Sequence, residues 1–259
     1  MRAMFEHASR SIQGGRSYQE DSAAVWSASA TTETANGGSA GELVAVLADG
    51  MGGHVGGAVA SSTACETFLG AISAAAGPVT RRLDVALAEA NEAIARRIHA
   101  EPRLSGMGCT LIGAIIGPQG LSWVSVGDSL LFVFRDGQLA ILNEDHSLAP
   151  MLDEMVAEGK MSLEEALTDP RRHYLRSALM GSAIELVDRP ENAIALEPGD
   201  IVVMATDGIE TLSEEQITRT IGATASRGVE AVVSGLLDAV EGGGDPYQDN
   251  TTVIAIRVR

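Results

Sequence analysis

The stretch that decides the fold is "VLADGMGGHVGG", residues Val46 to Gly57, where an apolar run ends on an acid and five glycines follow within eight residues. The apolar run is typical of a buried strand, and an Asp-Gly pair after it is typical of a tight turn. A turn by itself accounts for one such pair. The alternative is that Asp49 holds a ligand and that the bare backbone lets this ligand approach closely.

Composition limits the classes of protein to consider. The chain has 259 residues and 45% hydrophobic content, which is enough for a substantial core. Its 18 Lys and Arg face 35 Asp and Glu, giving a net charge of −17. This balance argues against nucleic acid and against an anionic membrane surface as partners. No apolar run approaches the ~20 residues of a spanning helix, and the N-terminal residues lack a signal-peptide pattern, so a cytoplasmic protein is expected.

The two cysteines, Cys65 and Cys109, sit in apolar runs and form no CxxC motif. They could pair in principle. Two buried thiols in a reducing compartment are the favoured interpretation.

Apolar and β-branched runs predict eight strands, several of them consecutive along the chain. They cover Ala23–Trp26, Leu43–Ala48, Cys109–Ile116, Leu121–Val126, Leu130–Arg135, Leu139–Leu142, Ile201–Ala205 and Thr252–Val258. Asp136-Gly137, between two of them, predicts a hairpin turn. The small, polar stretch from Ser27 to Gly41 is interpreted as a loop.

Helices are predicted in three parts of the chain. Two Ala-rich segments come after the glycine-rich stretch, two further helices begin with capping-box patterns, and one more lies near the C-terminus. They cover Gly57–Ala76, Val79–His99, Leu163–Leu167, Glu214–Ile221 and Val229–Val240. Runs of strands around blocks of helix favour an α+β fold with antiparallel sheets flanked by helices.

The opening motif has a counterpart later in the chain. "IVVMATDG", Ile201 to Gly208, again ends an apolar strand on Asp-Gly, so Asp49 and Asp207 form a candidate pair. Asp249 directly precedes the last strand, Asp128 occupies a Gly-Asp corner between two strands, and Glu20-Asp21 precedes the first strand. Each acid alone is compatible with a turn. Together they suggest a site at the strand ends, where carboxylates repel one another unless hard cations such as Mg²⁺ or Mn²⁺ compensate them.

The ordered set "RSYQED", "LADGMGG", "GMGCT", "VGDS", "DHSL", "ATDG" and "QDNTTV" resembles the metal-dependent Ser/Thr protein phosphatases of type 2C, in their bacterial form. The resemblance extends from about Gly14 to the C-terminus. It implies one protein phosphatase domain over residues 1–259. The implied fold is α+β, with two antiparallel β-sheets packed as a central sandwich and helices on both outer faces.

The resemblance also implies a role for each acid. Asp49 would bridge two metal ions, and the carbonyl of Gly50 would bind the second of them. Asp207 and Asp249 would bind the first ion, and Glu20 would reach the second through water. Asp128 would share a third ion with Asp207. Asp21 would orient water in the site. The implied cofactors are two or three Mn²⁺ or Mg²⁺ ions for each chain.

Arg16 lies four residues before Glu20, where the family places its phosphate-binding arginine. Even spacing would put both side chains on one face of a strand. A guanidinium fork suits two phosphate oxygens. A solvated surface arginine is the alternative.

Two features of the site stay open. Met51 stands where eukaryotic relatives carry a histidine, and His54 either donates a proton through water or begins a helix, so no general acid is assigned. The flap expected at residues 150–182 carries several basic residues. It is either a solvated surface helix or a lid that docks the substrate.

The predicted function is therefore a protein Ser/Thr phosphatase that hydrolyses phosphoserine and phosphothreonine by attack of a metal-activated water. The expected partners are phosphorylated proteins, which a cognate Ser/Thr kinase would phosphorylate. A monomer is expected. The alternative is a catalytically inactive relative that binds phosphoproteins as a regulatory module. A structural calcium-binding domain and a nucleotide-binding protein are less favoured, since the sequence has neither an EF-hand nor a GK[ST] motif.

Overall fold

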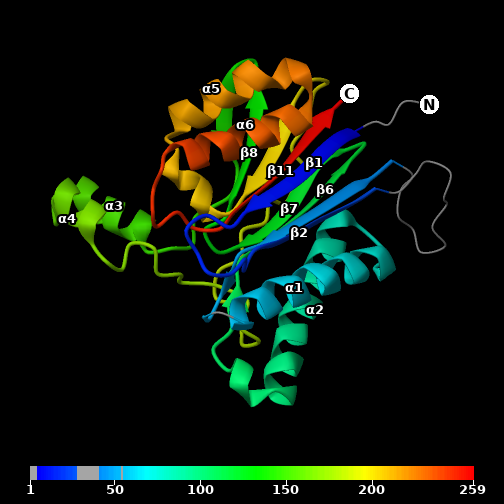
Figure 1. The fold of residues 1–259 in the computed structure, drawn as a ribbon. Coiled ribbons are helices and arrows are strands. Elements are labelled where there is room, and N and C mark those ends of the chain that lie inside the picture. Colours follow the sequence, from blue (N-terminus) through cyan, green and yellow to red (C-terminus); the bar gives the residue numbers. More distant parts are fainter. Residues whose placement is uncertain (1–4, 28–40, 54) are drawn as a thin grey trace.

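The computed structural model describes residues 5–27, 41–53 and 55–259. Two antiparallel sheets form its centre, and helices cover both outer faces (Figure 1). The α+β sandwich predicted from the sequence is confirmed. The predicted loop from Ser27 to Gly41 falls largely outside the described residues, as does His54.

The first sheet has five strands in the order β1 (Phe5–Ile12), β11 (Thr251–Val258), β10 (Ile201–Ala205), β8 (Leu130–Arg135) and β9 (Gln138–Ile141). The second has four, in the order β2 (Ser22–Ser27), β3 (Leu43–Ala48), β6 (Leu111–Gly117) and β7 (Gly120–Val126). A short ribbon joins β4 (Gly50–Met51) to β5 (Gly108–Cys109). The central strands of both sheets therefore come from distant parts of the sequence.

Helices α1 (Val55–Ala74) and α2 (Val79–Ala100) pack on the four-stranded sheet. Helices α5 (Glu214–Thr224) and α6 (Val229–Gly242) pack on the five-stranded sheet. Helices α3 (Ala149–Ala157) and α4 (Leu163–Thr168) stand away from these layers (Figure 1). Short 3₁₀ turns lie at Pro102–Leu104, Asp207–Thr211 and Ala225–Arg227. No helix among the described residues is both long and apolar enough to cross a membrane.

Strand β3 shows why the central strands lack an alternating polar pattern. Leu43, Ala45 and Leu47 pack between the two sheets, whereas Val44, Val46 and Ala48 face α1 and α2. All six residues are fully buried. A strand that is covered on both faces is apolar throughout, because neither set of side chains reaches water.

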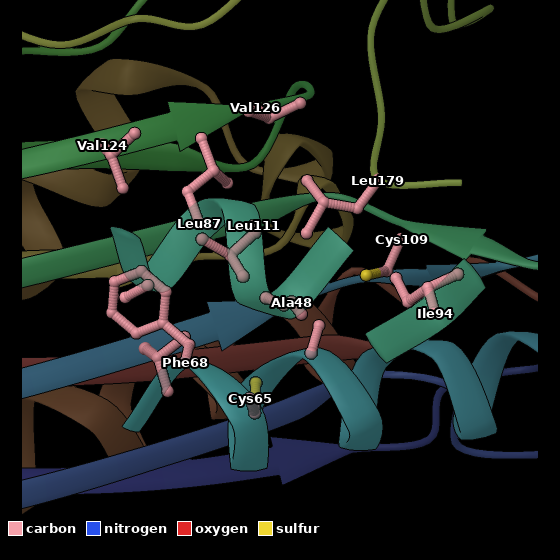
Figure 2. Close-up of a cluster of buried hydrophobic side chains, with 14 of the residues drawn as sticks. Ala48, Cys65, Phe68, Leu87, Ile94, Cys109, Leu111, Val124, Val126 and Leu179 are labelled. Carbon is pink, nitrogen blue, oxygen red and sulfur yellow. The ribbon is translucent and has the colours of Figure 1, made fainter. Parts of the chain in front are cut away.

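The cluster under α1 and α2 also holds both cysteines. Figure 2 shows Cys65 and Cys109 among the aliphatic side chains of this cluster, together with Phe68. Both thiols are free and buried, as predicted. Burial raises the pKa of Cys65 to about 12 and raises the pKa of Cys109 well above its usual value.

Most predicted elements are confirmed to within a few residues at their ends. Asp136 (φ 50°) and Gly137 (φ 80°) form the predicted turn between β8 and β9, with the positive φ angles of a two-residue hairpin. Capping boxes begin α4 at Ser162 and α5 at Ser213. The turn and the capping boxes could be predicted from the sequence because each depends only on residues that are close together in the chain.

Three features differ from the prediction. The expected strand Cys109–Ile116 is interrupted at Thr110, because the chain leaves the ribbon there and enters β6. Strand β1 was not predicted, since "FEHASRSI" mixes polar and apolar residues, as an edge strand can. Helix α3 was not predicted as a separate element, because no side chain caps its first turn.

Candidate active site

The two Asp-Gly motifs place their acids at the ends of two interior strands, one in each sheet. Asp49 follows β3, and Asp207 follows β10. Their carboxyl groups interact, because burial and the charge of Asp207 raise the pKa of Asp49, and burial is also the first cause of the raised pKa of Asp207. The sandwich therefore brings together two acids that are 158 positions apart in the chain.

These acids line a cavity of about 610 Å³. Every metal or phosphate ligand predicted from the sequence contributes to its wall, namely Arg16, Glu20, Asp49, Gly50, Asp128, Asp207 and Asp249. The remaining predicted residue, Asp21, lies behind this wall. The structure thus gathers the whole predicted set around one place.

Asp21 is held from two sides by threonine hydroxyls. Thr206 and Thr252 donate hydrogen bonds to its Oδ2 at 2.9 and 2.7 Å. Its Oδ1 is buried and has no hydrogen-bond partner among the described residues. Burial, together with the nearby charges of Asp207 and Asp249, raises the pKa of Asp21 to about 7.

The other acids are shifted in the same direction. Burial is the first cause of the raised pKa of Asp49, and the charge of Asp207 adds to it. Asp128 sits at the corner between β7 and β8, where burial and the charge of Asp207 raise its pKa to about 8. Burial and the charge of Asp249 also raise the pKa of Asp207. Such a cluster resists ionisation unless positive charge enters it.

Arg16 is not on a strand, so the expectation that it shares a strand face with Glu20 is wrong. Strand β1 ends at Ile12 and β2 begins at Ser22, which leaves Arg16 in the connecting loop. This loop is tied to the segment before β11, because the N–H of Gly15 donates to the carbonyl of Gln248 at 2.7 Å. The guanidinium of Arg16 forms an ion pair with Asp249.

The donor set fits divalent cations with oxygen ligands. The buried Oδ1 atoms of Asp21 and Asp207 have no hydrogen-bond partner among the described residues, and several acids in the cluster have raised pKa values. Hard cations prefer such carboxylate and carbonyl oxygens. In the described part of the chain, no three His, Cys, Asp or Glu side chains already converge as ligands of one ion. To hold an ion, Asp49 must be ionised and Asp249 must exchange Arg16 for the cation.

Sequence reasoning missed the residues that position these acids. The Oγ1 of Thr110 accepts a hydrogen bond from the N–H of Asp49 at 2.9 Å, and Thr110 itself lines the cavity. Asn250 accepts from the N–H of Glu20 at 2.8 Å and donates to the carbonyls of Gln13 and Tyr18. The motifs "GMGCT" and "QDNTTV" contain both residues and were the available signal.

The wall opposite the acids comes from the predicted flap. Residues 173–178 and Met180 line the cavity, while α3 and α4 lie outside it. Backbone hydrogen bonds fix this wall, since Leu179 pairs with Cys109 at 2.9 and 3.0 Å and the N–H of Leu148 donates to Tyr174. The flap thus contributes part of the site and does not stand apart from it.

Comparison with known proteins gives a family match. The family model described as protein phosphatase 2C matches residues 30–233. The Ser/Thr protein phosphatase PstP of Mycobacterium tuberculosis is 33% identical over 230 residues, which cover 85% of this chain and 41% of that protein. The Ser/Thr phosphatase stp of Listeria monocytogenes is 30% identical over 177 residues, which cover 66% of this chain and 68% of that protein.

Solved structures agree with this match. The crystal structure of M. tuberculosis PstP/Ppp aligns with a TM-score of 0.78 at 30% identity, covering 98% of this chain and 99% of that one. The catalytic domain of PstP in complex with two manganese ions gives a TM-score of 0.74 at 29% identity, covering 98% and 97%. The Streptococcus agalactiae Ser/Thr phosphatase gives 0.79 at 26% identity, covering 98% and 100%.

Proposed function

Because this chain belongs to the protein phosphatase 2C family, we propose that its acidic cavity hydrolyses phosphoserine and phosphothreonine in proteins, with divalent cations as cofactors. The observation that carries this proposal is the gathering of the predicted acids around one cavity, beside an arginine. No thiol competes as nucleophile, because Cys65 and Cys109 lie in the hydrophobic core.

The chain spans about two fifths of the length of the mycobacterial PstP proteins it matches, 41% of each. The activity of the whole protein is therefore inferred from this part. We take residues 1–259 as one catalytic domain, with residues 150–182 as its flap. The manganese ions of the PstP catalytic domain support Mn²⁺ or Mg²⁺ as the cofactor.

Asp49, Gly50, Asp207 and Asp249, with Glu20 acting through water, would hold two ions. Asp128 and Asp207 would hold a third. When bound, such ions lower the pKa of a water nucleophile and neutralise charge on the phosphoryl oxygens. The acids are suited to this role because their buried carboxylates are costly until a cation compensates them.

The chain's own residues then orient the reaction. The guanidinium of Arg16, at the cavity wall, binds two phosphate oxygens and holds the phosphoryl group in line with the attacking water. The Oδ1 of Asp21 accepts a hydrogen bond from a water in the site and so orients it, since its Oδ2 already accepts from Thr206 and Thr252. We assign no general acid for the leaving oxygen.

The physiological partners follow from this chemistry. The substrates are phosphoproteins, and a Ser/Thr kinase must supply them. The excess of acidic residues disfavours nucleic acid and anionic membranes, and we propose a monomer that acts in the cytoplasm.

The test is release of phosphate from a phosphothreonine peptide, measured with Mn²⁺ and with excess chelator. We expect turnover with Mn²⁺ or Mg²⁺ and none in chelator, with recovery when the ion is added back. Full activity in chelator would contradict the metal-dependent mechanism. Binding of the phosphopeptide in Mn²⁺ without any release of phosphate would favour the inactive regulatory module.

A further inference from the structure

Three arginines occur within six residues of the flap, and their surroundings differ. Arg171 forms two hydrogen bonds to Asp169, at 3.0 and 2.7 Å. Arg172 forms two to Asp153, at 2.8 and 3.0 Å. The guanidinium of Arg176 forms no ion pair or hydrogen bond with any residue in the described ranges. Because the first two side chains are occupied by acids of the flap itself, Arg176 is the one of the three available for another anion.

Arg176 also lies on the wall of the proposed active site. It lines the cavity that holds the acids, whereas Arg171 and Arg172 do not. Its backbone is fixed, since its N–H donates to the carbonyl of His146 at 2.8 Å and the neighbouring Leu175 pairs with Ser147. The backbone position from which the Arg176 side chain extends is therefore fixed on the wall of the site.

Asp145 directly precedes His146, but its carboxylate already accepts hydrogen bonds from another residue. Asp145 accepts hydrogen bonds from the N–H and the hydroxyl of Ser147, at 2.7 and 2.9 Å. Because Arg176 forms no ion pair among the described residues, its exposed guanidinium is available to an anionic group of a substrate. Arginine binds carboxylate and phosphate groups through a planar fork, so the partner is anionic.

The same wall offers apolar contacts. Tyr174 is 61% exposed and Met180 is 42% exposed, and both line the cavity with Arg176. A cavity of about 610 Å³ falls within the range that holds whole drug-sized ligands, so a phosphoryl group and its ions leave room for neighbouring residues of a peptide. The flap wall therefore has the composition of a peptide-binding surface with one cationic position.

We infer that Arg176 binds an acidic side chain close to the phosphorylated residue, and that the enzyme prefers phosphopeptides carrying Glu or Asp at that position. This inference rests on the proposed phosphatase function. It assigns Arg176 to substrate selection and leaves the phosphoryl group to Arg16 and the cations.

The experiment measures kcat/KM on a set of phosphothreonine peptides with alanine flanks, in which one Glu is moved from three residues before to three residues after the phosphothreonine. Assays use Mn²⁺ at low ionic strength. At one position of Glu we expect kcat/KM to rise by about 2- to 5-fold over the all-alanine peptide, as befits a solvent-exposed ion pair. The gain should appear in KM, and added salt should reduce it.

Two variants of Arg176 sharpen the result. Arg176→Ala should abolish the preference for the Glu peptide. Arg176→Glu should reverse it, so that a peptide with Lys at the same position becomes the better substrate. Arg227→Ala is the matched control, because Arg227 is exposed, has no ion pair among the described residues and lies outside the cavity. The Arg227→Ala variant should prefer the Glu peptide as strongly as the unmodified protein does.

The outcomes separate this inference from the proposed function. If the unmodified protein hydrolyses none of the peptides, the phosphatase proposal fails. If it hydrolyses all of them equally well, or if Arg176→Ala keeps the preference for Glu, only the role of Arg176 is overturned. An equal loss on every peptide in Arg176→Ala would also overturn it, since Arg176 would then act on the phosphate common to them all.

Discussion

The two Asp-Gly strand ends have similar sequences, Leu43–Gly50 and Ile201–Gly208, but the chain continues differently after each. After Asp49 it forms the β4–β5 ribbon and enters α1, and after Asp207 it makes a single 3₁₀ turn. A Cβ atom on Gly50 would lie 2.2 Å from the carbonyl oxygen of Gly57, which is seven residues away. A Cβ atom on Gly208 would lie 2.2 Å from the carbonyl oxygen of Asn250, next to the last strand.

The difference shows how one local motif can serve two packing arrangements. Gly50 is required by a segment that follows immediately, whereas Gly208 is required by a segment 42 residues later. The acids differ as well, because Asp49 lies between β3 and β4 whereas Asp207 begins the 3₁₀ turn. A repeated motif therefore predicts the position of an acid but not its neighbours.

The largest expected effect is on turnover. Asp49→Asn and Asp207→Asn each remove a carboxylate that we propose is shared between cation sites, and we expect each to lower kcat by about 10³-fold or more, corresponding to several kcal/mol of lost transition-state stabilisation. Phosphate release from a phosphothreonine peptide at saturating Mn²⁺ provides the measurement. If one of the two variants retained near-normal turnover, the two strand ends would not be equivalent parts of one site.

A smaller loss is expected at the corner between β7 and β8. Asp128→Ala removes an acid that, in the proposed site, shares only a third ion with Asp207, so turnover should fall by about 10-fold, or about 1.4 kcal/mol. Calorimetric titration with Mn²⁺ should still show the two stronger sites. Loss of both strong sites in Asp128→Ala would mean that this acid belongs to the central pair.

The two glycines can be compared through stability. Gly50→Ala and Gly208→Ala force a Cβ atom against a backbone carbonyl, and we expect each to lower the free energy of unfolding by about 1–3 kcal/mol. Gly70, inside α1, has open space where a Cβ atom would lie and is the control. Gly70→Ala should stabilise the protein by about 0.4–1 kcal/mol. Thermal unfolding in chelator ranks the three variants. An unchanged Tm in Gly208→Ala would show that the segment before β11 can shift to make room for the new Cβ atom.

The last expected effect concerns pH in the presence of chelator. The folded protein holds Asp21, Asp49, Asp128 and Asp207 with raised pKa values, to about 7 for Asp21 and about 8 for Asp128. An acid whose pKa is raised on folding binds more protons in the folded state, so its stabilising contribution is full below about pH 4 and is lost as the pH rises through its folded pKa. Tm should therefore fall between about pH 4 and pH 8.

Mn²⁺ should oppose that fall, since it binds the ionised carboxylates of the folded state. At pH 8 in chelator, Asp49→Asn should have a higher Tm than the unmodified protein, because it removes one buried charge from the cluster. A pH-independent Tm in chelator would contradict the raised pKa values. An Asp49→Asn variant that is less stable at pH 8 would show that the other contacts of the Asp49 carboxyl group outweigh the repulsion.

Local patterns predicted the α+β class and the acids at the strand ends, whereas the two-sheet sandwich was implied by the family resemblance. An apolar run ending in Asp-Gly identifies β3 and β10 without knowledge of the rest of the fold. Strand β1 could not be read in this way, because its place at the sheet edge depends on pairing with β11 at the other end of the chain. The ion pair of Arg16 with Asp249 depends on a loop path that strand spacing does not encode. The threonines that hold Asp21 come from two further strand ends, so only the assembled sheet shows their role.

The location of the two thiols has a consequence for the protein under oxidative stress. Peroxides attack thiolates that solvent can reach, and both sulfur atoms here are protonated and enclosed by aliphatic side chains and helices (Figure 2). The proposed hydrolase uses water as its nucleophile and therefore has no catalytic thiol to lose. Dephosphorylation by this protein should therefore continue at peroxide concentrations that silence cysteine-dependent enzymes, for as long as its divalent ions remain bound and unoxidised.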